Sequence, residues 1–230
     1  MAIVSMQEVV KNYHLGKTVV NALRGIDLEI EKGEFICIAG PSGSGKTTLL
    51  NLIGCLDKPS SGKVFLDEND VEKLNDNRLS KLRAEKIGFI FQTFNLIPVL
   101  SAFENVEYPL LLKAVPRSSR KKRVLSMLEE VGLSDFTRHR PNQLSGGQRQ
   151  RVAIARALVT DPEMILADEP TANLDSKTGE AIVDLMRKIN EEMKATFIFS
   201  THDAMVMKYA HRMMRLQDGR IVDLGGQNEN

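Results

Sequence analysis

The first third of the chain alternates apolar and polar residues, with glycines between the alternating stretches. A period of two predicts short β-strands, since successive side chains of a strand point to opposite faces. The predicted strands cover Ile3–Tyr13, Val19–Leu23 and Asp27–Ile30. A fourth stretch, Glu34–Ala39, is apolar without alternation, which is typical of a strand buried on both faces. A glycine-rich segment follows it, and then an apolar helix through Thr48–Gly54.

The rest of the chain begins with a helical region and then returns to alternating strands and helices. From about Asn95 to Arg140 apolar residues recur at helix spacing, and Gly132 is placed to end one of these helices. The alternation that follows predicts an α/β fold with a parallel sheet, into which the helical region is inserted. The expected elements are strands at Glu163–Ala167 and Ala195–Ser200, helices at Ser176–Glu192 and Asp203–Ala210, and a hairpin at Arg212–Gln217 and Arg220–Leu224 that turns at Asp218-Gly219.

Composition and charge narrow the class of protein. The chain has 230 residues, 42% of them hydrophobic, and its 31 basic and 30 acidic residues leave a net charge of +1. The hydrophobic content excludes a disordered chain. The charge balance argues against a nucleic-acid binder that works by bulk electrostatics. The longest stretch without charge, Ile87–Phe103, contains Gln92 and Pro98, so no membrane span is expected. No leader peptide is expected, and the two cysteines, Cys37 and Cys55, lack the spacing of metal ligands. Both features predict a soluble protein of the reduced cytoplasm.

A glycine-rich run follows the buried strand and opens the next helix. Glycines allow successive backbone N–H groups to curl around an anion, and the helix directs its positive end towards it. We expect Lys46 to neutralise β- and γ-phosphate oxygens and the Thr47 hydroxyl to bind Mg²⁺, and we group Thr48 with them. The alternative is a flexible turn, which does not account for the flanking strand and helix. The run matches the phosphate-binding pattern G-x-x-x-x-G-K-[ST] with Gly40, Pro41, Ser42, Gly43, Ser44, Gly45, Lys46 and Thr47.

A later apolar strand ends in two adjacent acids, Asp168 and Glu169. A carboxylate at this position can hold the coordination shell of Mg²⁺, a role that we assign to Asp168. Glu169 is then placed to orient or deprotonate an attacking water molecule. The alternative is a strand end with two solvated acids.

A second glycine-rich helix start contains Ser145, Gly146, Gly147 and Gln148. Ser145 and Gln148 have the spacing of a capping box, which is a sufficient structural explanation for these two residues. Two glycines in the first turn weaken a helix by about 1 kcal/mol each, so they indicate that another group approaches this backbone closely. The free N–H groups of a helix start can bind an anion, so this segment is a second candidate anion site.

Together, the phosphate loop, the Leu144–Gln148 signature and the acid pair resemble the ABC-type ATPase cassette, over nearly the whole chain. The resemblance implies further roles. Tyr13 matches the aromatic residue that stacks on adenine, although an ordinary strand aromatic is an alternative. Gln92 matches the glutamine that reaches Mg²⁺ or water, and His202 matches the histidine that contacts the γ-phosphate. Asp175 matches the loop that crosses between two cassettes.

The resemblance also implies an architecture and a reaction. The expected fold is a P-loop NTPase core with a mixed, mainly parallel sheet, an N-terminal antiparallel β subdomain and a helical insertion. The expected domain spans residues 1–224, with its core at 1–92 and 160–224, its insertion at about 93–159, and a flexible tail at 225–230. The expected reaction is hydrolysis of ATP with Mg²⁺ in a homodimer that forms head to tail on ATP binding.

Within this family, the chain is similar to a bacterial branch of lipoprotein-release and macrolide-export ATPases. In that branch the cassette is either a separate subunit or fused to its permease, which has a large extracytoplasmic domain. Because no span is expected here, we expect a separate integral membrane permease and a subunit that is cytoplasmic and peripheral on the inner face of the cell membrane. The apolar segment Phe94–Leu100 is either buried core or a groove for a short permease helix. The basic run Arg117–Arg123 is either a solvated helix start or a contact with anionic lipid headgroups. The similar stretches are Ile53–Pro59, Gly88–Gln92, Phe94–Pro98, Glu104–Val106 and Ala167–Thr171.

Two other function classes are weighed against this interpretation. An ABC ATPase that acts on nucleic acid or the ribosome needs no permease, but a single cassette, no heptad arm and no basic excess disfavour it. A P-loop kinase is disfavoured by the Leu144–Gln148 signature. We therefore expect no nucleic-acid partner.

Overall fold

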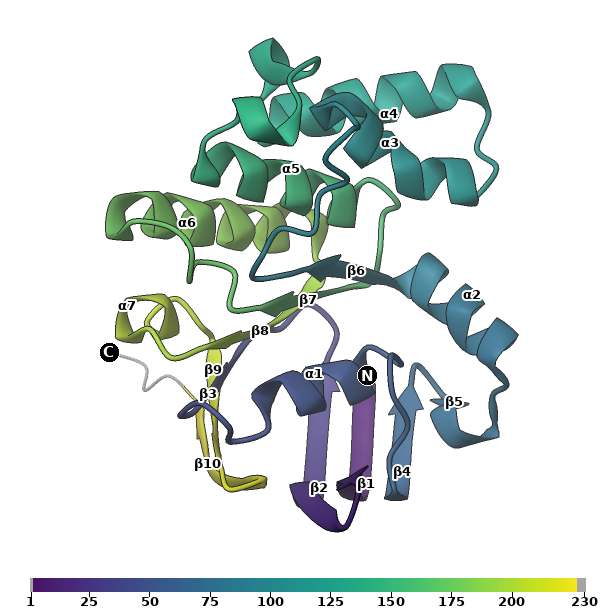
Figure 1. Ribbon diagram of the computed structural model, residues 1–230, viewed down its shortest axis with the longest axis vertical. Coiled ribbons are helices and arrows are strands. Elements are labelled where there is room, and N and C mark those ends of the chain that lie inside the picture. Colours follow the sequence, from purple (N-terminus) through teal and green to yellow (C-terminus); the bar gives the residue numbers. More distant parts are fainter. Residues whose placement is uncertain (1, 227–230) are drawn as a thin grey trace.

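The computed structural model describes residues 2–226 of the chain (Figure 1). Its central sheet has six strands in the order β10-β9-β3-β8-β7-β6, and only β10 runs antiparallel to its neighbour. Every residue of β3 is buried, as the apolar run predicts. The mainly parallel sheet confirms the expected fold class. Its strands are β3 (Phe35–Ala39), β6 (Ile87–Ile90), β7 (Met164–Asp168), β8 (Thr196–Thr201), β9 (Arg212–Gln217) and β10 (Arg220–Gly226).

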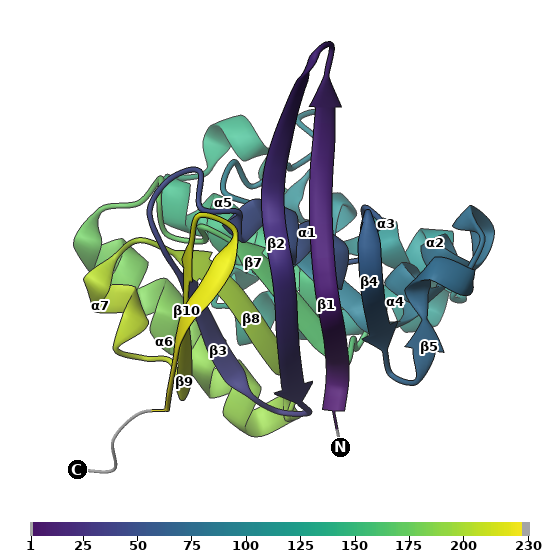
Figure 2. The same ribbon diagram turned by 90° about the horizontal axis from the view of Figure 1, so that it is seen from below.

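A second, antiparallel sheet contains the first two strands, also as expected (Figure 2). The predicted break between Val19–Leu23 and Asp27–Ile30 is wrong, because both stretches belong to one continuous strand. Gly25 lies in this strand with φ 78°, and the pairing of the two long strands shifts register nearby, so the glycine accommodates an irregularity without ending the strand. The sheet has the order β2-β1-β4-β5, with β1 (Ala2–Leu15), β2 (Thr18–Glu31), β4 (Ser61–Leu66) and β5 (Asn69–Asp70).

Two hydrophobic cores hold these layers together. One lies between the two sheets and surrounds helix α1 (Lys46–Ile53), whose Leu49 and Leu52 are fully buried. The other lies between the central sheet and the helices on its opposite face, with Phe35 and Phe199 at its centre. Because α1 is packed on both sides, the loop that precedes it has a fixed position at the edge of the central sheet.

The helical region lies over the β6–β7 side of the central sheet (Figure 1). Its helices α3 (Ala102–Leu112), α4 (Arg117–Glu130) and α5 (Gly146–Leu158) pack on one another. Gly132 follows the end of α4 with φ 71°, and the N–H of Leu133 donates to the carbonyl oxygen of Leu128, which confirms the predicted helix end. The short 3₁₀ helices are η1 (Val71–Lys73), η2 (Ser134–Phe136) and η3 (Pro141–Gln143).

Three further helices complete the fold. Helix α2 (Asp76–Lys86) was not predicted, since it is mostly polar and buries only Leu79 and Leu82. Helix α6 (Ser176–Met193) agrees with the prediction, whereas α7 (Ala204–Met207) is shorter than expected. Strand β10 continues through Gly226, into the predicted tail, and residues 227–230 lie outside the described part. No helix in residues 2–226 is both long and apolar enough to cross a membrane.

A candidate nucleotide site at the edge of the central sheet

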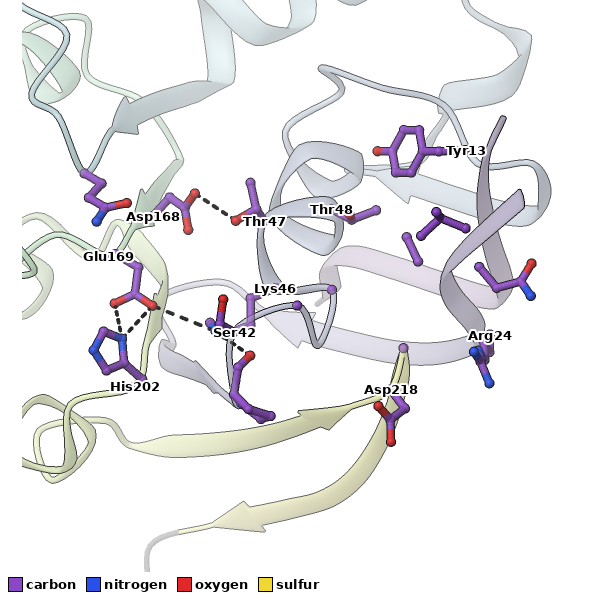
Figure 3. A pocket seen from close by; sticks show the side chains of 18 of the residues that line it. Tyr13, Arg24, Ser42, Lys46, Thr47, Thr48, Asp168, Glu169, His202 and Asp218 are labelled. Atoms are coloured by element: carbon purple, nitrogen blue, oxygen red, sulfur yellow. Dashed lines mark hydrogen bonds and ion pairs between the residues drawn. The ribbon is translucent and has the colours of Figure 1, made fainter. Parts of the chain in front are cut away.

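A cleft of about 1060 Å³ opens where β3, β7 and β8 end, which is where ligands bind in sheets of this kind (Figure 3). The phosphate loop follows β3, the acid pair lies at the end of β7, and His202 follows β8. The predicted residues that line the cleft are Tyr13, Pro41, Ser42, Gly43, Gly45, Lys46, Thr47, Thr48, Gln92, Asp168, Glu169 and His202. The structure therefore brings together most of the site that the sequence predicts.

The phosphate loop is a tight curl with no room for larger residues at two of its glycines. A Cβ atom at Gly40 would lie 2.2 Å from the carbonyl oxygen of Leu216, and one at Gly45 would lie 2.6 Å from that of Ala22. Gly45 also has φ 106°, a conformation that favours glycine. The hydroxyl of Ser44 is buried beside Gly40 and has no hydrogen-bond partner among the described residues. An orphaned donor inside the curl fits a site built for an anion.

Lys46 points back into this curl. Its side chain is only 8% exposed, and its Nζ atom donates to the carbonyl oxygens of Gly40 at 2.8 Å and Pro41 at 3.1 Å. The ammonium group thus lies inside the loop, where a phosphate oxygen is a stronger acceptor than a neutral carbonyl.

Thr47 and Asp168 converge next to it. The Thr47 hydroxyl donates to Oδ2 of Asp168 at 3.1 Å, and the Ser200 hydroxyl donates to Oδ1 at 2.5 Å. Ser200 is fully buried, and its Oγ atom also accepts the backbone N–H of Glu169 at 3.1 Å. Sequence analysis did not identify Ser200 as a site residue, although it connects both acids. Hydroxyl and carboxylate oxygens are the ligands that Mg²⁺ prefers, and Mg²⁺ keeps several of its waters, so two such ligands fit the ion.

Glu169 is held with its carboxylate facing the phosphate loop. Its backbone is left-handed, with φ 47°, and its side chain is 15% exposed. Nδ1 of His202 lies 3.0 Å from Oε1 of this carboxylate, and Nζ of Lys46 lies 3.8 Å from the same atom (Figure 3). The carboxylate therefore lies between the phosphate-loop lysine and the histidine that follows β8.

Gln92 enters the cleft from the other side. Its backbone carbonyl oxygen accepts a hydrogen bond of 2.8 Å from Nδ2 of Asn173, and its side chain is exposed at the cleft. The next segment is fastened to α5, because Arg156 donates to the carbonyl oxygens of Phe94 at 2.8 Å and Asn95 at 2.5 Å. Gln92 thus lies at the junction between the cleft and the helical region.

Tyr13 lies at the far end of the cleft from the acid pair (Figure 3). Its hydroxyl donates to Oδ2 of Asp57 at 2.9 Å, and Nζ of Lys11 lies 4.9 Å from the centre of its ring. Burial, and then the hydrogen bond to Asp57, raise the pKa of Tyr13. Lys11 and Asp57 are also paired at 2.6 Å. The ring is therefore fixed in orientation by two residues that sequence analysis did not assign to the site.

The C-terminal hairpin, β9 and β10, forms one wall of the cleft, a contact that the sequence pattern did not indicate. The N–H of Gly219 donates to the carbonyl oxygen of Ser44 at 3.0 Å, and the carbonyl oxygen of Gly219 accepts from the N–H of Arg24 at 2.8 Å. Gly219, Asp218 and Arg24 all line the cleft. The signal for this contact is absent from the local sequence because the hairpin lies far along the chain from the phosphate loop.

The signature residues are not part of this cleft. Ser145 caps α5, and Gln148 completes the predicted capping box. A Cβ atom at Gly147 would lie 2.5 Å from Cγ2 of Thr178, so this glycine permits α5 to approach α6 within the same chain. Asp175 caps α6 by accepting the N–H of Thr178 at 3.0 Å. The chain thus places its phosphate loop and its signature at two separate surfaces.

Comparisons with known proteins agree with this architecture. The family model described as ABC transporter matches residues 23–172. An uncharacterized ABC transporter ATP-binding protein of Thermotoga maritima is 52% identical, with 95% of this chain and 93% of that protein covered. The lipoprotein-releasing system ATP-binding protein LolD of Legionella pneumophila is 45% identical, with 95% and 96% covered. The macrolide export ATP-binding/permease protein MacB 1/2 of Paracoccus denitrificans is 46% identical over 96% of this chain but only 33% of its own length.

A solved structure is similar over almost the whole chain. It is the dimeric, post-hydrolysis state of the ATP-binding cassette MJ0796 bound to ADP and Pi, with 49% identity, a TM-score of 0.91, and 99% of this chain and 100% of that chain covered.

Proposed function

Because the chain belongs to the ABC transporter family, as an ATP-binding subunit that hydrolyses ATP, we propose that its cleft holds ATP with Mg²⁺ and that hydrolysis there powers a separate membrane permease. The observation that carries this proposal is the position of Glu169. Its carboxylate faces the phosphate loop between Lys46 and His202, where a γ-phosphate and its attacking water would meet.

The residues of the cleft have distinct proposed roles. The phosphate-loop N–H groups and Lys46 hold the phosphates, and Tyr13 stacks on the base. Thr47, Asp168 and Gln92 hold Mg²⁺, which neutralises charge that develops on the phosphate oxygens. Glu169 orients or deprotonates the water, and His202 contacts the γ-phosphate. The remaining proposed nucleotide contacts come from the signature, Ser145, Gly146, Gly147 and Gln148, and from Asp175.

The signature reaches the nucleotide from a second copy of the chain. This proposal is supported by the separation of the signature from the cleft within one chain and by the dimeric form of the similar cassette MJ0796. In a two-fold symmetric, head-to-tail dimer, the phosphate loop of each copy faces the signature of the other copy. Two equivalent sites therefore form together. ATP then closes the dimer, and hydrolysis removes the charge that both subunits share.

Gel filtration of a hydrolysis-deficient variant tests this arrangement. Glu169→Gln is expected to elute as a dimer with ATP and as a monomer with ADP. Glu169→Gln combined with Ser145→Arg is expected to bind ATP with unchanged affinity and yet remain monomeric, because Ser145 lies outside the cleft of its own chain. Dimerisation of this double variant, or loss of its ATP binding, contradicts the composite site.

The proposed permease contact is an apolar groove between β6, α2 and α3. It has a volume of about 250 Å³, and its walls include Phe89, Phe91, Pro109 and Leu112. Leu96 itself packs against the core, so the predicted segment Phe94–Leu100 supports the groove more than it lines it. A short amphipathic helix is the kind of partner that such a groove accepts.

The partner is proposed to be a permease with a large extracytoplasmic domain, of the lipoprotein-release or export type, with this subunit on the cytoplasmic face of the membrane. The similarity to LolD and to a third of the length of MacB 1/2 supports this branch. The insertion proposed at about 93–159 is supported by helices α3, α4 and α5, which lie over β6 and β7.

Co-purification tests the groove. Leu112 is 72% exposed, so Leu112→Asp leaves the core intact and is expected to abolish co-purification with the permease while ATP binding is unchanged. Leu125→Asp is a matched control, because Leu125 is 41% exposed on α4 and lies outside the groove. Retention of the permease by Leu112→Asp contradicts the assignment.

A further inference from the structure

The corner between α3 and α4 has an unusual concentration of positive charge. Residues 108–128 contain six basic residues, Lys113, Arg117, Arg120, Lys121, Lys122 and Arg123, and no acidic residue. Because the whole chain sums to +1, the rest of it carries a net negative charge. We call the surface formed by these six residues the basic corner.

Local structure explains only one of the charges at the start of α4. Arg120 is paired with Glu107 at 2.9 Å and also donates to the carbonyl oxygen of Val115. Arg117, Lys121, Lys122 and Arg123 are exposed, and among residues 2–226 none of them has an ion-pair partner. The helix start has no side-chain cap and no acid in its first turn, so these charges oppose the helix dipole. Because these basic side chains weaken their own helix, their presence is better explained by a binding partner that carries negative charge.

Exposed apolar side chains border the basic corner. Tyr108, Leu111 and Leu112 lie on one face of the last turns of α3 and are 43%, 45% and 72% exposed. Leu112 also lines the groove proposed for the permease. Figure 1 shows the α3–α4 connection at the same edge of the molecule as α2, which forms the other side of that groove. The basic corner is therefore continuous with the proposed permease surface.

We propose that the basic corner binds the anionic headgroups of the cytoplasmic membrane surface. Cations next to exposed aromatic and aliphatic side chains match the interface of a negatively charged bilayer, where lipid phosphates attract the cations and the apolar side chains enter the headgroup region. This inference rests on the proposed function, which places the neighbouring groove against a permease. Together with the permease helix in the groove, this contact fixes the orientation of the cassette relative to the membrane.

Vesicle flotation with the full chain tests the inference. The probes are vesicles of phosphatidylcholine alone and vesicles in which about one third of the lipid is phosphatidylglycerol, at low and at high salt. The triple variant Arg117→Gln, Lys121→Gln, Lys122→Gln removes three charges of the basic corner. The matched control Lys63→Gln, Lys73→Gln, Lys188→Gln removes three exposed charges elsewhere.

The expected result is binding only to the anionic vesicles, weakened by salt, with a partition coefficient that falls roughly 100-fold in the corner variant and little in the control. Equal binding of corner and control variants, or equal binding to both vesicles, overturns the inference. So does a corner-dependent affinity for duplex DNA or for the isolated permease in detergent without any affinity for anionic vesicles. ATP hydrolysis measured on the same preparations separates the two proposals, because the corner variant retains it even where vesicle binding is lost.

Discussion

Nδ1 of His202 lies 3.0 Å from the carboxylate of Glu169, and the two residues directly follow the neighbouring strands β8 and β7. The same carboxylate has the Lys46 ammonium 3.8 Å away on its other side. Two nitrogen groups from separate elements therefore hold Glu169 towards the phosphate loop, where we propose that the γ-phosphate binds. A carboxylate fixed in this way is prepared to act on a water molecule without a change of its own position.

Replacing Glu169 by Gln removes the proposed base and keeps the shape of the side chain. Turnover is expected to fall about 10²- to 10⁴-fold, which is the usual contribution of a positioned acid–base group. ATP affinity is expected to stay within a few fold of the wild-type value, because Lys46 and the phosphate loop are unchanged. Phosphate release measures the first quantity and titration calorimetry the second. Glu129→Gln, at an exposed position of α4, is the control, and near-normal turnover by Glu169→Gln contradicts the assignment.

Ser200 provides a test of the metal site. Its hydroxyl donates to Asp168 and accepts the N–H of Glu169, so Ser200→Ala leaves both acids less well oriented. Loss of such a supporting hydrogen bond typically costs 10- to 100-fold in metal affinity. The Mg²⁺ concentration for half-maximal turnover is therefore expected to rise by about that factor, while the rate at saturating Mg²⁺ falls less. Ser126→Ala on α4 is the matched control, and an unchanged Mg²⁺ requirement in Ser200→Ala excludes the supporting role.

Substitutions at Gly147 distinguish the packing role of the signature from its proposed contact with the nucleotide of a partner subunit. Alanine has the higher helix propensity, but its Cβ would lie 2.5 Å from Cγ2 of Thr178. We expect Gly147→Ala to lower the free energy of unfolding by about 1–3 kcal/mol, as overpacking does, measured by urea denaturation. Adding Thr178→Ser removes the opposing methyl group and is expected to restore stability. If ATP-dependent dimerisation remains defective in this stable double variant, Gly147 also contacts the partner; a fully stable single variant excludes the clash.

The parts of the site that the sequence predicted are local motifs. The phosphate loop, the acid pair and the capping box each depend on residues a few positions apart, so their geometry follows from the chain around them. The role of Ser200 could not be predicted, because it depends on the register that pairs Asp168 with Ser200 in neighbouring parallel strands. The contact between Gly147 and Thr178 is likewise a result of how two helices pack.

Some elements were missed for a different physical reason. Helix α2 buries only two leucines and is otherwise polar, so its hydrophobic pattern is too weak to predict a helix. In β2, Gly25 indicated a strand break, whereas the long partner strand β1 supplies enough pairing to carry the chain through the irregularity. The strand is thus a case of tertiary pairing that overrides a local signal.

Asp57 accepts the hydrogen bond that orients the Tyr13 ring. Its effect on nucleotide binding is therefore expected to pass through Tyr13. Burial favours the protonated form of Asp57, but hydrogen bonds from Lys11, the Lys58 N–H and Tyr13 outweigh it and lower its pKa, so the residue is ionised at neutral pH. Asp57→Ala frees the Tyr13 ring and is expected to raise KM for ATP about 3- to 10-fold with kcat unchanged. This lies within the range of a weakened base stack.

A double-mutant cycle distinguishes this positioning role from general destabilisation. In a Tyr13→Ala background, Asp57→Ala is expected to change KM no further, because the ring that it orients is absent. Inorganic tripolyphosphate, which has no base, is expected to bind wild type and Asp57→Ala equally well in calorimetry. Asp76→Ala, at the exposed start of α2, is the matched control. Additive effects of the two substitutions, or weaker tripolyphosphate binding by Asp57→Ala, show that Asp57 acts on the fold of the cleft instead of on the adenine contact.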